Sequence, residues 1–138
     1  MPPIDINYVA VVVSALVAFF VGAVWYSPVL FAKAWMSAHG YTSDKLDEMK
    51  QGMTRAYIVS FLSYVVMALV MGALVSWSGA STAGHGLRLG LYVWVGFAAT
   101  IGLTNVLFSD RKFATYLIDA GYQLVILLLM GLIMAIWN

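Results

Sequence analysis

The chain has 138 residues, enough for a single domain, and 63% of them are hydrophobic while only 9% are charged. An ordinary soluble domain is about 25% charged, so a soluble protein of this size could not bury so much apolar surface. The net charge is only +1, whereas a domain that binds nucleic acid carries a dense basic patch, so we expect no nucleic acid as a partner. The absence of cysteine excludes disulfides and thiolate metal sites. We therefore expect an integral membrane protein with the lipid bilayer as its solvent.

Four apolar segments are long enough to cross a hydrocarbon core, which takes roughly 20 helical residues. Because these runs are continuous, and because lipid requires internal backbone hydrogen bonds, we expect helices. The predicted fold is an all-α bundle of four transmembrane helices, with residues 1–138 as one membrane domain. The predicted spans are about 6–26, 56–77, 87–108 and 113–137.

A long connection, residues 27–55, follows the first span and forms a predicted interfacial and cytosolic elbow. Ser27 is a suitable N-cap, and Pro28 suits the first position of a helix, where its missing N–H is not needed. The residue before a proline is also disfavoured in the α region. We therefore predict that the first span ends near Tyr26 and that a short helix begins at Pro28.

Helical spacing makes this short helix amphipathic. Phe31 and Trp35 share an apolar stripe, and Lys33 lies opposite. We expect the helix to lie in the membrane interface as an anchor, with its aromatic rings toward lipid and Lys33 toward water. Gly40 is a suitable C-terminal stop. Capping and charged residues over 43–52 predict a second short, solvated helix.

Lysine and arginine are distributed unevenly between the two ends of the predicted bundle. Both the elbow (27–55) and the short connection 109–112 lie at one end, and together they hold Lys33, Lys45, Lys50, Arg55, Arg111 and Lys112. The other end, with both termini, holds Arg88 alone. The positive-inside rule therefore places both connections in the cytoplasm and both termini outside it.

Asp119, about two turns into the fourth span, is the main candidate for a functional residue. A carboxylate at mid-bilayer costs about 2.5–3.5 kcal/mol, and less nearer the cytosolic end. Polar side chains of the other helices fall at similar depth, so we expect a cytosol-facing intramembrane pocket. Its candidate ligand-binding residues are Asp119, Gln123, Tyr122, Asn105, Tyr64, Trp25 and Tyr26.

The same polar residues also have a structural interpretation. Buried polar side chains often only join helices, at about 0.6 kcal/mol each. Asp119 itself could pair with Arg55 or Arg111, or stay protonated through desolvation. Small residues at spacing four, such as Gly86-Gly90 and Gly96-Thr100-Thr104, allow close helix contact either within the chain or in a homodimer.

Motifs of catalysis are missing. The sequence has no HExxH motif, no paired carboxylates and no Ser-His-Asp pattern. His39 and His85 fall in predicted connections, so no pair of helices offers axial ligands to haem. We expect no catalytic residue, no metal site and no cofactor, and hence a protein that is not an enzyme.

The stretch Gly22–Met36, GAVWYSPVLFAKAWM, resembles the opening of the bacterial membrane proteins grouped as the domain-of-unknown-function 1761 family. The family signature is a Trp-Tyr-Ser-Pro group, a Phe-Gly-Lys-like step and a Trp-Met pair. The matching residues here are Trp25, Tyr26, Ser27, Pro28, Phe31, Lys33, Trp35 and Met36, with Ala32 where a glycine is common. The resemblance implies a four-helix architecture in the bacterial inner membrane and carries no activity.

Two classes of function follow from these patterns. The first is a transporter, channel-like or ligand-binding membrane protein with its pocket around Asp119. A proton-coupled exporter of the small multidrug type is a narrower version, and the lack of an acid in the middle of the first span disfavours it. The second is a structural or accessory subunit that contacts a partner through residues 27–55.

Overall fold

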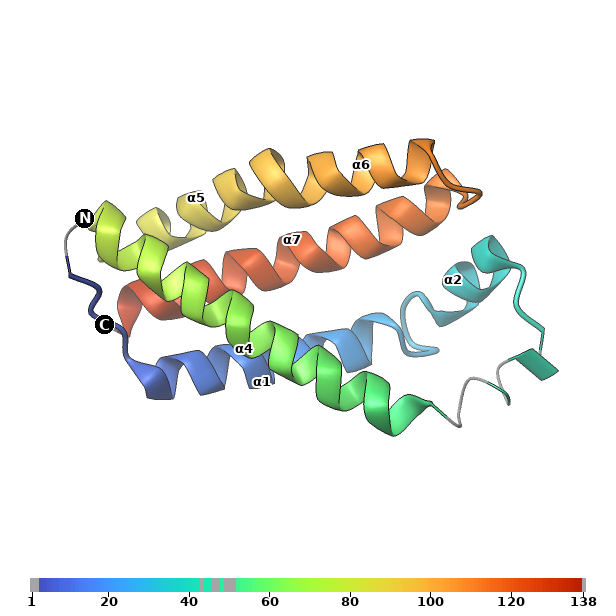
Figure 1. The fold of residues 1–138 in the computed structure, drawn as a ribbon, viewed down its shortest axis with the longest axis horizontal. Coiled ribbons are helices and arrows are strands. Elements are labelled where there is room, and N and C mark those ends of the chain that lie inside the picture. Colours follow the sequence, from blue (N-terminus) through green and yellow to red (C-terminus); the bar gives the residue numbers. More distant parts are fainter. Residues whose placement is uncertain (1–2, 43, 46–47, 49–51, 138) are drawn as a thin grey trace.

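The computed structural model describes residues 3–42, 44–45, 48 and 52–137, and four of its helical segments are long and apolar enough to cross a membrane. These are α1 (Tyr8–Trp25), α4 (Met53–Ser78), a third segment (Ala83–Leu107) and α7 (Phe113–Ile136). Each overlaps one predicted span, which confirms the helical membrane bundle. Both chain termini lie at one end of the bundle, and the two connections rich in Lys and Arg lie at the other (Figure 1).

Local capping explains where the long helices begin and end. Asn7 Oδ1 accepts a hydrogen bond from the Val9 N–H (3.0 Å), and Asn7 Nδ2 donates to the Trp137 carbonyl (2.9 Å), which ties the start of α1 to the end of α7. Gly79, with φ of 74°, ends α4 in the left-handed conformation that glycine adopts without strain. The Thr82 hydroxyl caps the next helix, α5 (Ala83–Val93).

Helix α7 is the centre of the bundle and contacts α1, α4 and α5. Its contact with α5 is the closest, because Gly86 of α5 faces Gly131 of α7 with no side chain between the backbones. A Cβ on Gly86 would collide with the carbonyl oxygen of Gly131, and one on Gly90 with that of Leu127. The spacing of four at Gly86-Gly90 therefore serves a contact inside the chain.

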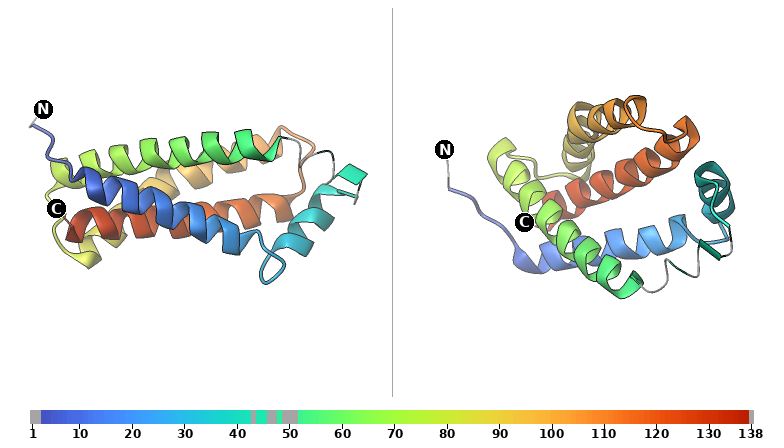
Figure 2. Two further views of the ribbon diagram at one scale, coloured as in Figure 1. Left: turned by 90° about the horizontal axis from the view of Figure 1, so that it is seen from below. Right: turned by 45° about the vertical axis from the view of Figure 1, so that its right-hand side comes forward.

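The third span is interrupted by a π-helical turn, η1 (Trp94–Ala98), before it continues as α6 (Ala99–Leu107). A π-turn inserts an extra residue and changes which face of the helix meets its neighbour. A Cβ added at Gly96 would accordingly meet nothing within 4 Å, and Thr100 and Thr104 are exposed. The second stripe of small residues thus faces away from the bundle described here, and α6 contacts α7 far less than α5 does (Figure 2).

The elbow helix begins later than predicted. Helix α2 spans Ala32–His39, and residues 28–31 form a turn. The prediction that Ser27 caps a helix starting at Pro28 is therefore wrong: the Ser27 hydroxyl donates to the Val24 carbonyl (2.6 Å) and completes the last turn of α1 instead. The stop was predicted correctly, since Gly40 adopts φ of 70° after the last residue of α2.

The aromatic face of the elbow turns toward the protein, which corrects the expectation that it faces lipid. The Phe31 ring lies 4.8 Å from the Trp25 ring, and the Trp35 ring meets Tyr26 edge-on at 6.1 Å. Lipid tails are as apolar as these rings, so exposure to lipid offers no advantage over ring–ring packing. Lys33 is exposed, and Phe31 and Trp35 are partly buried.

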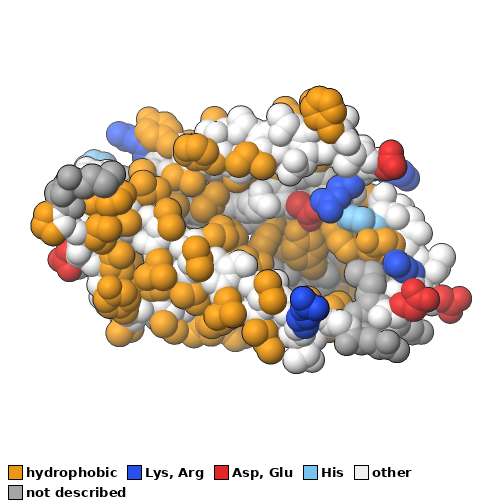
Figure 3. Space-filling view, in the orientation of Figure 1, with side chains coloured by type: hydrophobic (Ala, Val, Ile, Leu, Met, Phe, Trp, Pro, Cys, Tyr) orange, Lys and Arg blue, Asp and Glu red, His pale blue; other side chains and the backbone are white. Residues whose placement is uncertain are grey.

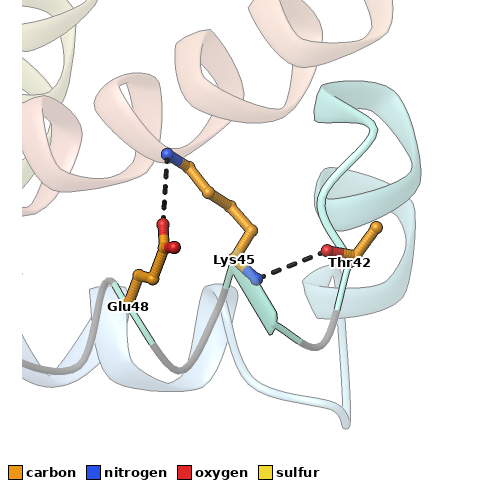
Figure 4. A network of polar contacts seen from close by, with 3 residues as sticks. All are labelled: Thr42, Lys45 and Glu48. Atoms are coloured by element: carbon orange, nitrogen blue, oxygen red, sulfur yellow. Dashed lines mark hydrogen bonds and ion pairs between the residues drawn. The ribbon is translucent and has the colours of Figure 1, made fainter.

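Beyond α2, the chain makes a short polar network of exposed residues (Figure 4). The Lys45 N–H donates to the Thr42 hydroxyl oxygen (3.3 Å), and the Lys45 ammonium lies 4.0 Å from a carboxylate oxygen of Glu48. An exposed pair of this kind adds little stability. Most of the predicted second short helix over 43–52 lies outside the described residues.

Candidate ligand-binding groove

Asp119 accepts a short hydrogen bond from the end of α1. The Tyr26 hydroxyl lies 2.6 Å from Asp119 Oδ1, and both side chains are half-buried. Tyr26 is directed at α7 because it is the residue at which α1 ends, held by the turn that follows. A hydroxyl bond to a carboxylate at this distance is of the strong, charge-assisted kind.

Two tryptophans fix the α7 backbone on either side of that carboxylate. Trp25 Nε1 donates to the Ile118 carbonyl (3.0 Å), and Trp94 Nε1 donates to the Ala120 carbonyl (2.9 Å). Together with Tyr26, they place one aromatic donor on each of three consecutive residues of α7. The Asp119 side chain therefore projects from a backbone that is held from α1 on one side and from η1 on the other.

Tyr122, one turn further along α7, is buried and packs against two neighbouring tyrosine rings. It is only 5% exposed, and its hydroxyl donates to the Ala18 carbonyl (2.7 Å). Its ring lies 5.5 Å from that of Tyr26 and 6.3 Å from that of Tyr64, both in edge-to-face geometry. These three rings form a wall that joins α1, α4 and α7.

Two adjoining cavities meet at Asp119. The aromatic cavity, about 550 Å³, lies between α4 and α6 over α7. The polar cavity, about 570 Å³, lies between α6 and α7 near the 108–112 turn. Both are lined by Gly102, Asn105, Asp119 and Gln123. Figure 3 shows the surface hollowed between α6 and the helices below it, with acidic and basic side chains at the edge.

The polar cavity holds hydrogen-bonding groups that the bundle does not use. Thr115 is 1% exposed, and its hydroxyl has no hydrogen-bond partner among the described residues. Arg111 also lines this cavity, yet neither Arg111 nor Arg55 forms an ion pair with Asp119 in the part of the chain that the structure describes. No three His, Asp or Glu side chains within that part gather as a metal site would require.

The structure brings the seven predicted site residues to one region. Six of them line the aromatic cavity: Tyr26, Tyr64, Asn105, Asp119, Tyr122 and Gln123. Trp25, the seventh, is not among the lining residues, and its indole N–H donates to the Ile118 carbonyl beside Asp119. Sequence reasoning missed Trp94 and Gly102. A signal for Trp94 existed, because it continues the spacing of four from Gly86 and Gly90.

Four apolar spans packed around a groove of aromatic rings and one carboxylate define a multi-pass helical membrane protein. The chain belongs to the family described as protein of unknown function (DUF1761), which it matches over residues 9–135. No curated protein and no solved structure matches the chain at a significant level. The family description states no activity, so function has to be argued from the groove.

Proposed function

We propose that this protein binds a small ligand in the groove around Asp119, reached from the cytosolic side of the bacterial inner membrane, and that it is not an enzyme. The observation that carries this proposal is a half-buried carboxylate, positioned by Tyr26, at the junction of two cavities. An ionisable group inside a membrane bundle is costly and usually marks a binding site or pathway.

The size and chemistry of the groove support binding. Ligand pockets are about 300–1,000 Å³, mostly apolar, with a few convergent polar groups, and the aromatic cavity, at about 550 Å³, fits this description. Asn105 and Gln123 provide amide donors and acceptors beside the carboxylate, and the buried hydroxyl of Thr115, which has no partner among the described residues, borders the polar cavity. Hydrogen bonds to a few such polar groups fix the orientation of a small ligand in its pocket.

A cytosolic opening agrees with the distribution of charge. The polar cavity lies beside the 108–112 turn, at the end of the bundle that also carries the elbow. Six of the seven Lys and Arg residues belong to these two connections. The groove would thus open toward the positive, cytoplasmic side.

The accessory-subunit alternative loses part of its basis. It was motivated by the amphipathic elbow, with Trp35 and Lys33, and by the capped segment that follows it. In the structure, Phe31 and Trp35 contact rings at the end of α1. Binding at the groove is therefore the function that the geometry supports best.

Cysteine reactivity tests the groove directly, because the natural chain contains no cysteine. We expect a Gln123→Cys variant in inverted membrane vesicles to react readily with a water-soluble maleimide. A Met130→Cys variant on the same helix is the control, since Met130 is 1% exposed. Equally slow labelling of the two variants would mean that the groove is closed, and would overturn the proposed function.

A further inference from the structure

We infer that the aromatic cavity selects a lipophilic organic cation, of the quaternary ammonium or phosphonium class. This inference rests on the proposed function and narrows it from a ligand of unspecified charge to one chemical class. It concerns the cavity between α4 and α6, rather than the polar cavity beside the 108–112 turn.

The charge of the residues that line the aromatic cavity predicts whether its ligand is a cation or an anion. Apart from tyrosine hydroxyls, Asp119 is the one ionisable acid or base among the described residues that line the aromatic cavity. Arg111 lines only the polar cavity, on the other side of the shared residues. A cation is therefore attracted to the aromatic cavity, and an anion is repelled from it.

One oxygen of the Asp119 carboxylate remains available to contact a bound cation. Tyr26 donates to Oδ1 of Asp119 at 2.6 Å, and Oδ2 has no hydrogen-bond partner among the described residues. The hydroxyl bond holds the carboxylate in place without neutralising it by an ion pair. A bound cation would supply the missing countercharge.

The walls favour a bulky, weakly hydrated cation over an inorganic ion. Tyr26, Tyr64 and Tyr122 present three aromatic rings, and the π-faces of such rings attract cations that shed water easily. Four large apolar side chains also line the cavity: Met67, Ile101, Ile126 and Leu127. A small metal cation would need several oxygen ligands in place of these groups.

A pair of probes with the same shape and opposite charge tests the inference. Binding of tetraphenylphosphonium and of tetraphenylborate is measured by equilibrium dialysis against the purified full chain in lipid nanodiscs. We expect saturable binding of tetraphenylphosphonium only, and a loss of affinity of about ten-fold or more in Asp119→Asn. Asp5→Asn, the same change at an exposed acid near the N-terminus, should leave the affinity unchanged.

A second measurement avoids dependence on the Asp119 variant. Tetraphenylphosphonium should slow maleimide labelling of Gln123→Cys, while tetraphenylborate should not. Equal effects of the two probes, or unchanged affinity in a folded Asp119→Asn, would overturn the cation assignment. Protection by an anionic or neutral compound alone would overturn it and leave the proposed function standing, whereas labelling as slow as that of Met130→Cys would overturn both.

Discussion

The bond between Tyr26 and Asp119 links residues 93 positions apart in the sequence, at 2.6 Å. It joins α1 to α7 at the depth where the two cavities meet. Because both side chains are half-buried, the carboxylate gains more from one well-placed hydroxyl than it would at a fully exposed surface. The pair therefore has both a structural and a site-forming role.

A double-mutant cycle on this pair should show coupling. We expect Tyr26→Phe and Asp119→Asn to lower the free energy of unfolding, with an interaction energy of about 0.5–2 kcal/mol between them. The measurement is SDS titration of the protein in mixed micelles. Tyr92→Phe is the matched control, because Tyr92 is 65% exposed on α5. Strict additivity of the two changes would contradict the hydrogen bond.

Asp119 could be identified from the sequence because a carboxylate in an apolar run stands out. The partner of its Oδ1 could not, since α1 and α7 are far apart in the chain and Arg55 or Arg111 offered an equally simple partner. The bond from Trp94 to the Ala120 carbonyl was also beyond sequence reasoning. It depends on how the third span and α7 are aligned along their length, which a spacing pattern does not give.

At the scale of elements, the contact between α5 and α7 depends on glycine. Gly86 and Gly131 bring the two backbones together, and a Cβ at Gly86 would meet the carbonyl oxygen of Gly131. Backbone atoms of two packed helices cannot move aside as the tip of a side chain can. The loss of this one glycine should therefore separate the helices.

We expect Gly86→Ala to lower the free energy of unfolding by about 1–3 kcal/mol through overpacking. The comparison variant is Gly84→Ala in the same helix, where an added Cβ meets nothing within 4 Å. Gly84→Ala should instead change stability by less than about 1 kcal/mol, in the stabilising direction. Equal thermal melting shifts in the two variants would argue against this close contact.

The elbow depends on one left-handed residue. Gly40 has φ of 70°, and the Tyr41 N–H that follows it bonds to the Met36 carbonyl at 3.0 Å. Gly40→Ala should cost about 1–2 kcal/mol locally and speed amide hydrogen exchange at Tyr41. Gly52→Ala is the control, because Gly52 has an ordinary φ of −100°. Unchanged exchange at Tyr41 would contradict the assigned turn.

The four long apolar helices were predictable, because continuous apolar runs mark them, although α4 and the third span begin about one turn earlier than predicted, at Met53 and Ala83. The start of α2 was not, since Ser27 had two competing roles, as a cap of the next helix or as the last hydrogen-bond donor of α1. The direction of Trp35 was also missed. An amphipathic stripe shows which side chains share a face, and it does not show whether lipid or protein covers that face.

At the scale of the whole molecule, the two ends of the bundle differ in charge. The elbow and the 109–112 connection share one end, while the 79–82 connection lies at the other (Figure 1). The positive-inside rule then predicts that only the second end is reached from outside the cell. This prediction rests on the sequence alone, because it requires only the order of the spans and the number of Lys and Arg residues in each connection.

Ser81→Cys should react with an impermeant maleimide in intact cells, and Ser109→Cys only after permeabilisation. Both positions are exposed serines in connections, so the pair is matched in chemistry. Since the natural chain has no cysteine, it gives no background of its own. The reverse pattern of labelling would place the groove on the opposite side of the membrane.

The aromatic cavity lies between α4 and α6, and the residues that it shares with the polar cavity connect it to the 108–112 turn, so we infer two routes to it: one from that turn and one from the side of the bundle. A solute that enters by the side comes from the leaflet, where an amphiphile is concentrated by its partition coefficient. The occupancy of the site would then follow the amount of solute dissolved in lipid rather than in water. A site of modest intrinsic affinity would fill at low aqueous concentration, and its apparent selectivity would include the selectivity of the bilayer itself.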